Sequence, residues 1–504
     1  MVKLVKVYRF LVYILPAVLF FSYWPVISLG ASESMNFELS LPLIWLVIFD
    51  VLAFWILVKK KLLKGIWRKW LWLLFPVFVS LSVLWSMNSL RGLLTVGILW
   101  LVYFAGYAFW SLRSLFSEFG FLEKFWKVFF ASALVACGWC LLQCILDIAG
   151  VPRGVSLVCA GCTYQMFGFP HPNGWAIEPQ FMGNLLLAPA ITSAWMVMQD
   201  ICNGTFRGRV AHARRRGVRA LILGRNLRKP LKIPLPNIFN CHLLLVVFMF
   251  FVFVATIFLT FSRGAIYAFA VSMIFMTAMM VVRTKKWRVM LVWPVILVAF
   301  LFTLNLQGMM AEFGPTSDNY STGVAKVLNH LSLGIIDIRG GDEKKVSEET
   351  DALVSEITEE NVDNDEKSEA VFDGYVEEST DTRLRLSGAA AEVWKQDFTT
   401  MMFGVGIGGA GQALYVNKLS PAPKEIVQNE YASLLLETGF IGVALLILTV
   451  GLIVRAVYQN EMVTTLIVAY AITLLFFSGL PNVLHIYLLP ALFIALCGKS
   501  LYHK

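Results

Sequence analysis

The stretch LLLVVFMFFVFVATIFLTFSRGAIYAFAVSMIFMTAMMVV occupies residues 243–282 and contains a single charged residue, Arg263. A helix that crosses a lipid bilayer needs roughly 20 predominantly apolar residues. A stretch of this length therefore makes two crossings, joined by a turn at residues 261–265. The tripeptide Ser262-Arg263-Gly264 is the polar part of that turn. The sequence thus predicts helices packed in a membrane rather than a soluble globular domain.

The composition of the whole chain agrees with this prediction. Of its 504 residues, 58% are hydrophobic and only 15% are charged, whereas a soluble domain carries about 25% charged residues. The net charge is +9, which in a soluble protein would suggest nucleic acid or anionic lipid as a partner. Here the basic residues are segregated, with ten Lys or Arg and no acid between Arg207 and Lys232. Basic cytoplasmic loops of a membrane protein explain this better, and we expect no nucleic-acid partner.

We predict an all-α polytopic membrane protein with about twelve transmembrane helices. The spans fall near residues 12–29, 40–58, 70–86, 92–112, 128–148, 178–198, 242–261, 265–283, 289–306, 436–454, 463–479 and 485–500. With this count the basic segments all lie on one side, which is the cytoplasmic side and holds both termini. These segments are the N-terminal tail, Lys59–Lys69, Arg113–Lys127, Arg207–Lys232, Arg283–Arg288, Arg455 and the C-terminal tail.

This topology divides the chain into three parts. Spans 1–9 lie in residues 1–306, a large extracytoplasmic loop in residues 307–435, and spans 10–12 in residues 436–504. Within the loop, residues 342–381 hold sixteen Asp or Glu against three Lys, which is typical of a disordered insert. Helical periodicity on both sides of it, at 320–338 and 384–398, predicts two helices.

Arginines on the outer side are exceptions to the positive-inside pattern. Arg263 is the most informative because the turn between two spans holds its charge close to the hydrocarbon. It is either a clamp for phosphate or carboxylate groups or a snorkelling side chain that contacts lipid headgroups. The other outer arginines are Arg91, Arg153, Arg383 and Arg385, and we expect them, together with Asn429, to bind the substrate.

A glycine-rich stretch, Gly404 to Gly411, has the look of a phosphate cradle. It lacks the Gly-Lys-Ser/Thr ending of a nucleotide-binding P-loop and lies on the expected outer side. We therefore favour a loop that packs closely against the outer face of the protein. No plausible metal motif stands elsewhere, because Asp363-Asn364-Asp365 lies in the acidic insert; we expect neither a metal nor a cofactor.

Two polar clusters stand at the entrances of spans. One runs from Val427 through Gln428, Asn429 and Glu430 into span 10, and could be a site or an interfacial anchor with the helix-packing pair Gly439 and Gly442. The other contains Glu178, at the start of span 6. An acid at that place could equally stabilise the positive end of a helix.

Taken in order along the chain, these features resemble the O-antigen ligase and O-antigen polymerase family, bacterial proteins with about a dozen spans and a large periplasmic loop late in the sequence. The matching pieces are Ser262-Arg263-Gly264, an arginine before a helix with Trp394, the 404–409 glycines, and Gln428-Asn429 followed by Gly439-Phe440-Ile441-Gly442. The resemblance implies a metal-independent glycosyltransferase in the bacterial cytoplasmic membrane. It would move a glycan from a polyprenyl diphosphate to a hydroxyl of a glycan, lipid or protein acceptor.

The resemblance also assigns roles to residues. Arginines can stabilise the charge that builds on a diphosphate leaving group, with Arg263 first and Arg383 or Arg385 next. Ligases of this family carry a His immediately before the Asn, where this chain has Gln428. An amide cannot accept a proton at neutral pH, so Glu178 and Glu430 are the candidate bases. Ligase and polymerase activities both stay open.

Two other classes of function compete with glycan transfer. A transporter or flippase of lipid-linked saccharides would depend on the mid-span acid Asp50. A non-catalytic scaffold of envelope assembly would use the acidic insert as a docking segment.

Overall fold

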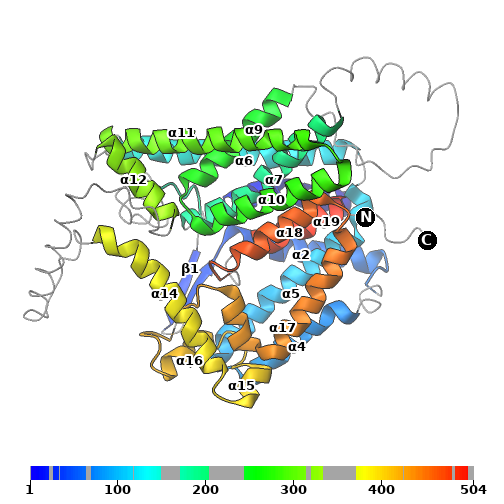
Figure 1. Ribbon diagram of the computed structural model, residues 1–504. Coiled ribbons are helices and arrows are strands. Elements are labelled where there is room, and N and C mark those ends of the chain that lie inside the picture. The colour runs from blue at the N-terminus through cyan, green and yellow to red at the C-terminus, as the bar shows by residue number, and fades with distance from the viewer. Residues whose placement is uncertain are drawn as a thin grey trace, which may run out of the picture.

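The computed structural model describes residues 2–21, 27–32, 35–63, 70–116, 119–148, 171–176, 178–203, 243–313, 319–332, 371–423, 425–478 and 483–497. These residues form a helical bundle with one two-stranded hairpin (Figure 1). The α-helices are α1 (Val2–Phe20), α2 (Leu41–Lys59), α4 (Leu74–Ser82), α5 (Ser89–Ser111), α6 (Phe119–Ile148), α7 (Pro179–Asn203), α9 (Leu243–Leu259), α10 (Arg263–Thr284), α11 (Val292–Phe313), α12 (Tyr320–Leu331), α14 (Val371–Trp394), α15 (Phe398–Phe403), α16 (Ala410–Val416), α17 (Glu430–Val457), α18 (Glu461–Thr473) and α19 (His485–Cys497). Short 3-10 helices cover Trp70–Leu73, Val83–Trp85, Arg113–Phe116 and Trp287–Leu291, and the hairpin pairs β1 (Ile27–Ser32) with β2 (Met35–Leu39).

Each predicted span overlaps a helix. Among the residues that the structure describes, seven helices are long and apolar enough to cross a membrane: α2, α5, α6, α7, α10, α11 and α17. Shorter apolar helices cover Trp70–Trp85, Leu243–Leu259, Glu461–Thr473 and His485–Cys497. The helical membrane architecture is confirmed. The count of twelve crossings, the cytoplasmic termini and the side on which each loop lies stay predictions.

The N-terminal helix differs from its prediction in position. It runs from Val2 to Phe20 rather than over 12–29, and the hairpin follows it. Its buried face begins at Tyr8 and continues through Leu11, Leu15 and Leu19, a spacing that keeps one stripe of the helix against the bundle. Lys3 and Lys6 lie on the exposed side, so their charges do not stop the helix from starting before the apolar stretch.

Helix α7 lies at the centre of the bundle. Of its most apolar stretch, 89% is buried, and it packs against α9, α10 and α18. Helix α17 is at the opposite extreme, with only 17% buried. Glu178 therefore lies at the start of the central helix α7, whereas Gln428 and Asn429 lie at the start of the peripheral helix α17.

The described part of the segment between α11 and α17 forms α12, α14, α15 and α16 (Figure 1). The predicted helix at 320–338 is confirmed as α12, which packs on α11. The predicted helix at 384–398 is the second half of α14, which packs on α16 and α17. Helices α14 and α16, the glycine-rich loop and the start of α17 share a small core of their own, composed of Leu386, Ala389, Ala390, Val393, Val405, Ala410, Ala413, Leu414, Val427 and Leu436.

The acidic insert lies mostly outside the described residues. Where it enters them, the backbone is helical from Val371, because α14 extends backward from its packed half. Arg153 and the basic stretch 207–232 also lie outside the described residues.

Helix α17 begins at Glu430, earlier than the predicted span at 436–454, and it is broken at Gly439. Gly439 has φ of +62°, and a Cβ there would lie 2.5 Å from the Met402 carbonyl. Positive φ is accessible to glycine without steric cost. The pair Gly439 and Gly442 therefore does more than ease helix packing: Gly439 separates the polar start of α17 from its apolar remainder.

Candidate active site

Arg263 is the first residue of α10 and lies directly after the turn that the apolar stretch predicted. Phe261 makes the turn with φ of +48°, and the Ser262 side chain caps the helix by accepting from the Ala265 N–H at 3.4 Å. The Arg263 side chain is buried, with 9% exposed. A guanidinium at a helix N-terminus adds its charge to the positive end of the helix dipole, and the two together attract phosphate.

Arg383 on α14 contacts the start of α17. Its Nε donates to the Gln428 Oε1 at 2.7 Å. The residue that stands where the family's ligases have a His is thus tied to an arginine. Arg385, two residues later on the same helix, is exposed. Residues two apart on a helix point to different sides, so Arg383 is the one of the two that faces the start of α17.

His330 on α12 connects Arg263 with Arg383. Its Nε2 lies 3.0 Å from the Phe261 carbonyl oxygen, in the turn that carries Arg263. Burial lowers the pKa of His330 to about 3; the Phe261 carbonyl opposes that shift, and the positive charges of Arg263, His171 and Arg383 add to it. Arg263, His171 and Arg383, from three separate segments, therefore each lie within electrostatic reach of His330. We call Arg263, Arg383, Gln428, His330, His171 and Glu178 the arginine rim.

Glu178 joins the rim from the end of α7. Its side chain is exposed, yet the surrounding protein displaces enough water to raise its pKa above the ordinary value, while the nearby Arg383 opposes the rise. The preceding residues are firmly held. The Gln143 Nε2 donates to the Asn173 Oδ1 at 3.0 Å, and the Gly174 N–H donates to the Gln143 Oε1 at 2.8 Å. This network fixes the segment that carries His171 into the rim.

The glycine-rich loop packs closely against two neighbours, as predicted, while its place on the outer side of the membrane stays a prediction. The Met87 N–H donates to the Val405 carbonyl at 3.2 Å, and the Gly406 N–H donates to the Glu437 carbonyl at 2.9 Å. Gly404, Gly406 and Gly408 all have positive φ. A Cβ on Gly408 would lie 2.6 Å from the Gly92 backbone nitrogen, so the loop approaches α5 more closely than a side chain allows.

Two backbone N–H groups of the loop already bond a carboxyl group of the chain, that of Glu437. The Ala410 N–H donates to the Glu437 Oε1 at 3.3 Å, and the Gly408 N–H bonds the same carboxyl group. The cradle is thus filled by an anion from the chain itself. A nucleotide phosphate would have to displace a covalently tethered carboxylate.

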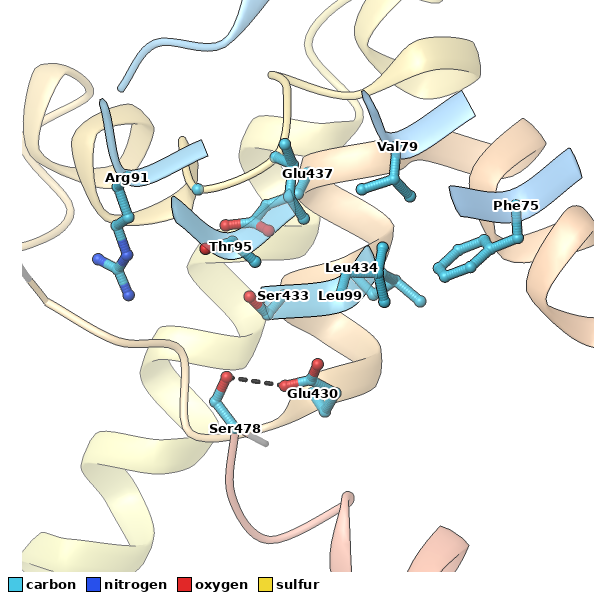
Figure 2. Close-up of a pocket in the computed structure, with 12 residues that line it drawn as sticks. Phe75, Val79, Arg91, Thr95, Leu99, Glu430, Ser433, Leu434, Glu437 and Ser478 are labelled. Atoms are coloured by element: carbon cyan, nitrogen blue, oxygen red, sulfur yellow. Dashed lines mark hydrogen bonds between the residues drawn. The ribbon is translucent and has the colours of Figure 1, made fainter. Parts of the chain in front are cut away.

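A pocket lies beside this loop, between α4, α5, α17 and the residues after α18 (Figure 2). Arg91, predicted as a substrate-binding residue, lines it together with Glu430, whose Oε2 accepts from the Ser478 hydroxyl at 2.7 Å. We call it the Arg91 pocket; its lining is Phe75, Val79, Arg91, Thr95, Leu99, Ile407, Gly408, Glu430, Ser433, Leu434, Glu437 and Ser478.

Asn429 has a local structural task. Its Oδ1 accepts from the Tyr431 and Ala432 N–H groups at 3.1 and 3.2 Å, which caps α17. Asn429 lies between Gln428, which contacts Arg383 of the arginine rim, and Glu430, which lines the Arg91 pocket.

His171, His330 and Glu437 were not among the residues singled out from the sequence. His330 lies in a helix whose apolar periodicity suggested packing alone. The one available signal for Glu437 was that an acid preceded Gly439 at the start of a predicted span. For His171, nothing in the local pattern marked it.

Comparison with known proteins agrees with the geometry. Residues 248–447 match the family model described as O-antigen ligase, and no curated protein matches the chain. The matched segment is less than half of the 504 residues, but it contains Arg263, Arg383, the glycine-rich loop and the whole polar start of α17. This family implies glycosyl transfer of the ligase or polymerase type on a lipid-linked glycan. Residues 248–447 of this chain are thus similar to the O-antigen ligase family.

Proposed function

We propose that this protein transfers a glycan from a polyprenyl diphosphate to an acceptor hydroxyl at the outer face of the bacterial cytoplasmic membrane. One observation carries the proposal: Arg263 and Arg383, which are 120 positions apart by number (383 − 263), both act electrostatically on His330. Two arginines that converge on one place, with one of them at a helix N-terminus, suit a diphosphate.

The arginines would act on the leaving group. The acceptor oxygen attacks the anomeric carbon, and the bond between that carbon and the phosphate oxygen breaks with both electrons going to the phosphate. Negative charge therefore grows on the diphosphate in the transition state. Arg263 and Arg383 stabilise it without reorganising, because α10 and Gln428 already hold them in place.

We propose Glu178 as the base that takes the acceptor's proton. Gln428 cannot take it, and its Oε1 already accepts from Arg383, so its task is to position that guanidinium. Glu178 lies near Arg383, is exposed to an incoming acceptor, and has a raised pKa. A carboxylate whose pKa lies closer to the working pH is a better proton acceptor. Glu430, the other predicted base, accepts from Ser478 in the Arg91 pocket.

The test is Arg263→Ala in the full-length protein, reconstituted in membranes with a polyprenyl-diphosphate-linked glycan. We expect transfer to fall by about 10²–10³-fold, the usual cost of removing one preorganised charge donor. Arg385→Ala is the matched control, since it removes an exposed arginine from α14 and should keep its rate. Wild-type rates with inserted Arg263→Ala protein refute the clamp. Growth of the glycan itself identifies a polymerase, whereas transfer to a different acceptor identifies a ligase.

Transport of lipid-linked saccharides is the second candidate, and one observation favours it. Asp50 is buried in α2 with 5% exposed, and neither of its oxygens has a hydrogen-bond partner among the described residues. Ion-coupled flux that is lost in Asp50→Asn, with no new glycosidic bond formed, would identify this function.

A further inference from the structure

The turn that follows α18 contacts the starts of three helices. It covers residues 474–478, and Figure 2 shows its last residue, Ser478, beside Glu430. The Glu430 N–H donates to the Leu474 carbonyl at 2.9 Å, and the Ser478 hydroxyl donates to the Glu430 Oε2 at 2.7 Å. Both ends of this segment, which we call the 474–478 turn, are therefore bonded to the start of α17.

The start of α7 contacts the middle of the turn. The Gln180 Nε2 donates to the Phe476 carbonyl oxygen at 3.2 Å. One residue further along each segment, the rings of Phe181 and Phe477 meet edge to face, with their centroids 5.8 Å apart. Gln180 is two residues after Glu178, so their Cα atoms are at most about 7 Å apart. The turn thus holds the backbone that carries the proposed base.

The side chain of Phe476 faces α10. A Cβ added to Gly264 would lie 2.8 Å from the Phe476 Cβ and 3.1 Å from its Cγ, so a larger residue at 264 would push the two segments apart. The Phe476 ring also packs on Tyr267, one turn later in α10, with ring centroids 5.8 Å apart. Gly264 directly follows Arg263. The contact therefore fixes the first turn of the helix that carries this arginine.

We propose that Phe476 is a positioning residue for glycan transfer: it holds the start of α7, with Glu178, and the start of α10, with Arg263, at a fixed separation. Its carbonyl oxygen holds α7 through Gln180, and its ring holds α10 through Gly264. It acts through these two residues and not on the substrate.

The separation of the two helix starts matters because each carries a different part of the reaction. The proposed base acts on the acceptor, and the arginines act on the leaving group. A misplacement of about 1 Å in such a centre can cost about 10²-fold in rate. Phe476 lies beyond the matched residues 248–447, so we expect the matched segment alone to hold these groups at no fixed distance. This role rests on the proposed function, whereas the contacts of Phe476 do not.

Hydrogen–deuterium exchange of the full-length protein in nanodiscs tests the contacts without any transfer reaction. Phe476→Ala removes the ring but keeps the carbonyl, so peptides that cover the first turns of α10 should exchange about tenfold faster. Gln180→Leu removes the bond to that carbonyl, so peptides that cover the start of α7 should respond in the same way. Leu475→Ala is the matched control: it changes the neighbouring residue of the turn, whose side chain is 48% exposed, and should exchange like the wild type.

Kinetics with a polyprenyl-diphosphate-linked glycan test the role in transfer. Phe476→Ala should lower kcat about tenfold with little change in KM, because the arginine acts on the transition state. Phe476→Leu, which keeps an apolar side chain against Gly264, should recover most of that rate. Gly264→Ala disturbs the same contact from α10, so the double variant Gly264→Ala/Phe476→Ala should be about as slow as the slower single variant. Gly264→Ala combined with Leu475→Ala should show the loss of Gly264→Ala alone.

Unchanged exchange at both helix starts in Phe476→Ala and Gln180→Leu overturns the proposal. Multiplied losses in the double variant also overturn it, because the two residues would then act independently. If Phe476→Ala exchanges faster throughout, including the centre of α7, it is unfolded, and Phe476→Leu and Gln180→Leu decide instead.

A failed clamp and a failed positioning role give different results. Transfer that is lost in Arg263→Ala but keeps its wild-type kcat in Phe476→Ala removes the positioning role alone. Full activity of Arg263→Ala refutes the clamp and with it the positioning role, even where the exchange results confirm the contacts.

Discussion

Replacing Gly406 with alanine should detach the glycine-rich loop from its neighbours. Gly406 has φ of +87°, and a Cβ there would lie 2.6 Å from the Ser86 backbone nitrogen and 2.7 Å from the Ser82 carbonyl oxygen. Both are backbone atoms, which cannot turn aside as the end of a flexible side chain can. An L-residue in this region also costs roughly 1–2 kcal/mol. The loop must therefore lift or the α4–α5 connection must shift.

The magnitude follows from the bonds that lifting breaks. Three hydrogen bonds join the loop to the α4–α5 connection: Met87 N–H to the Val405 carbonyl, Ser86 hydroxyl to the Ile407 carbonyl, and Ile407 N–H to the Ser82 hydroxyl. At about 1 kcal/mol each, their loss lowers the free energy of loop opening by about 3 kcal/mol. That corresponds to roughly a hundredfold larger open population.

Hydrogen–deuterium exchange of the full-length protein in nanodiscs measures this population. Peptides that cover 404–411 should exchange about a hundredfold faster in Gly406→Ala, while peptides from the centre of α7 stay unchanged. Gly388→Ala is the matched control, because Gly388 is exposed on α14 and no atom lies within 4 Å of its added Cβ. That change should stabilise α14 by about 0.5–1 kcal/mol. Equal exchange of 404–411 in the two variants would refute the close-packing argument.

Two further predictions concern the arginine rim. Glu178→Gln should lower kcat about 10²–10⁴-fold. In the wild type, kcat/KM should fall as the pH decreases through the raised pKa of Glu178, since the base must be unprotonated. A fully active Glu178→Gln would assign the base to Glu430, and full activity of both Glu178→Gln and Glu430→Gln would mean that neither residue is the base. His330 has a pKa of about 3 against an ordinary 6.5, so the unfolded chain binds the proton more tightly, and stability should be complete above pH 6.5 and fall as pH drops toward 3. In His330→Gln this fall should shrink, as followed by thermal unfolding in detergent at several pH values; an unchanged pH dependence would mean that other groups cause it.

The features that depend on local chemistry were predictable from the sequence. The turn at Arg263 follows from the length of the apolar stretch alone, since about 40 residues cannot make one crossing. The close packing of the 404–411 loop follows from glycines at alternate positions. Both are statements about the backbone, which the residue types restrict directly.

The features that depend on how distant segments meet were not predictable. Arg383 and Arg385 lie two residues apart on α14, and only Arg383 faces the start of α17. The sequence of α14 alone does not show which side of the helix faces α17. His330 looked like part of a packed helix and proved to face Phe261 in a turn 69 residues earlier. The filling of the glycine cradle by Glu437 likewise needed the fold.

The central place of α7 has a consequence for how the protein is made. It has the lowest mean hydropathy of the seven long apolar helices, and it buries Asn184, Thr192 and Ser193. Polar groups disfavour partition of a single helix into lipid during biosynthesis, whereas packing against neighbouring helices keeps them away from the lipid. Helices α9, α10 and α18, which cover α7, are all translated after it. We expect α7 to be retained stably in the bilayer only when they arrive, so Glu178 at its end reaches the arginines late in assembly, and a truncated chain holds no active centre.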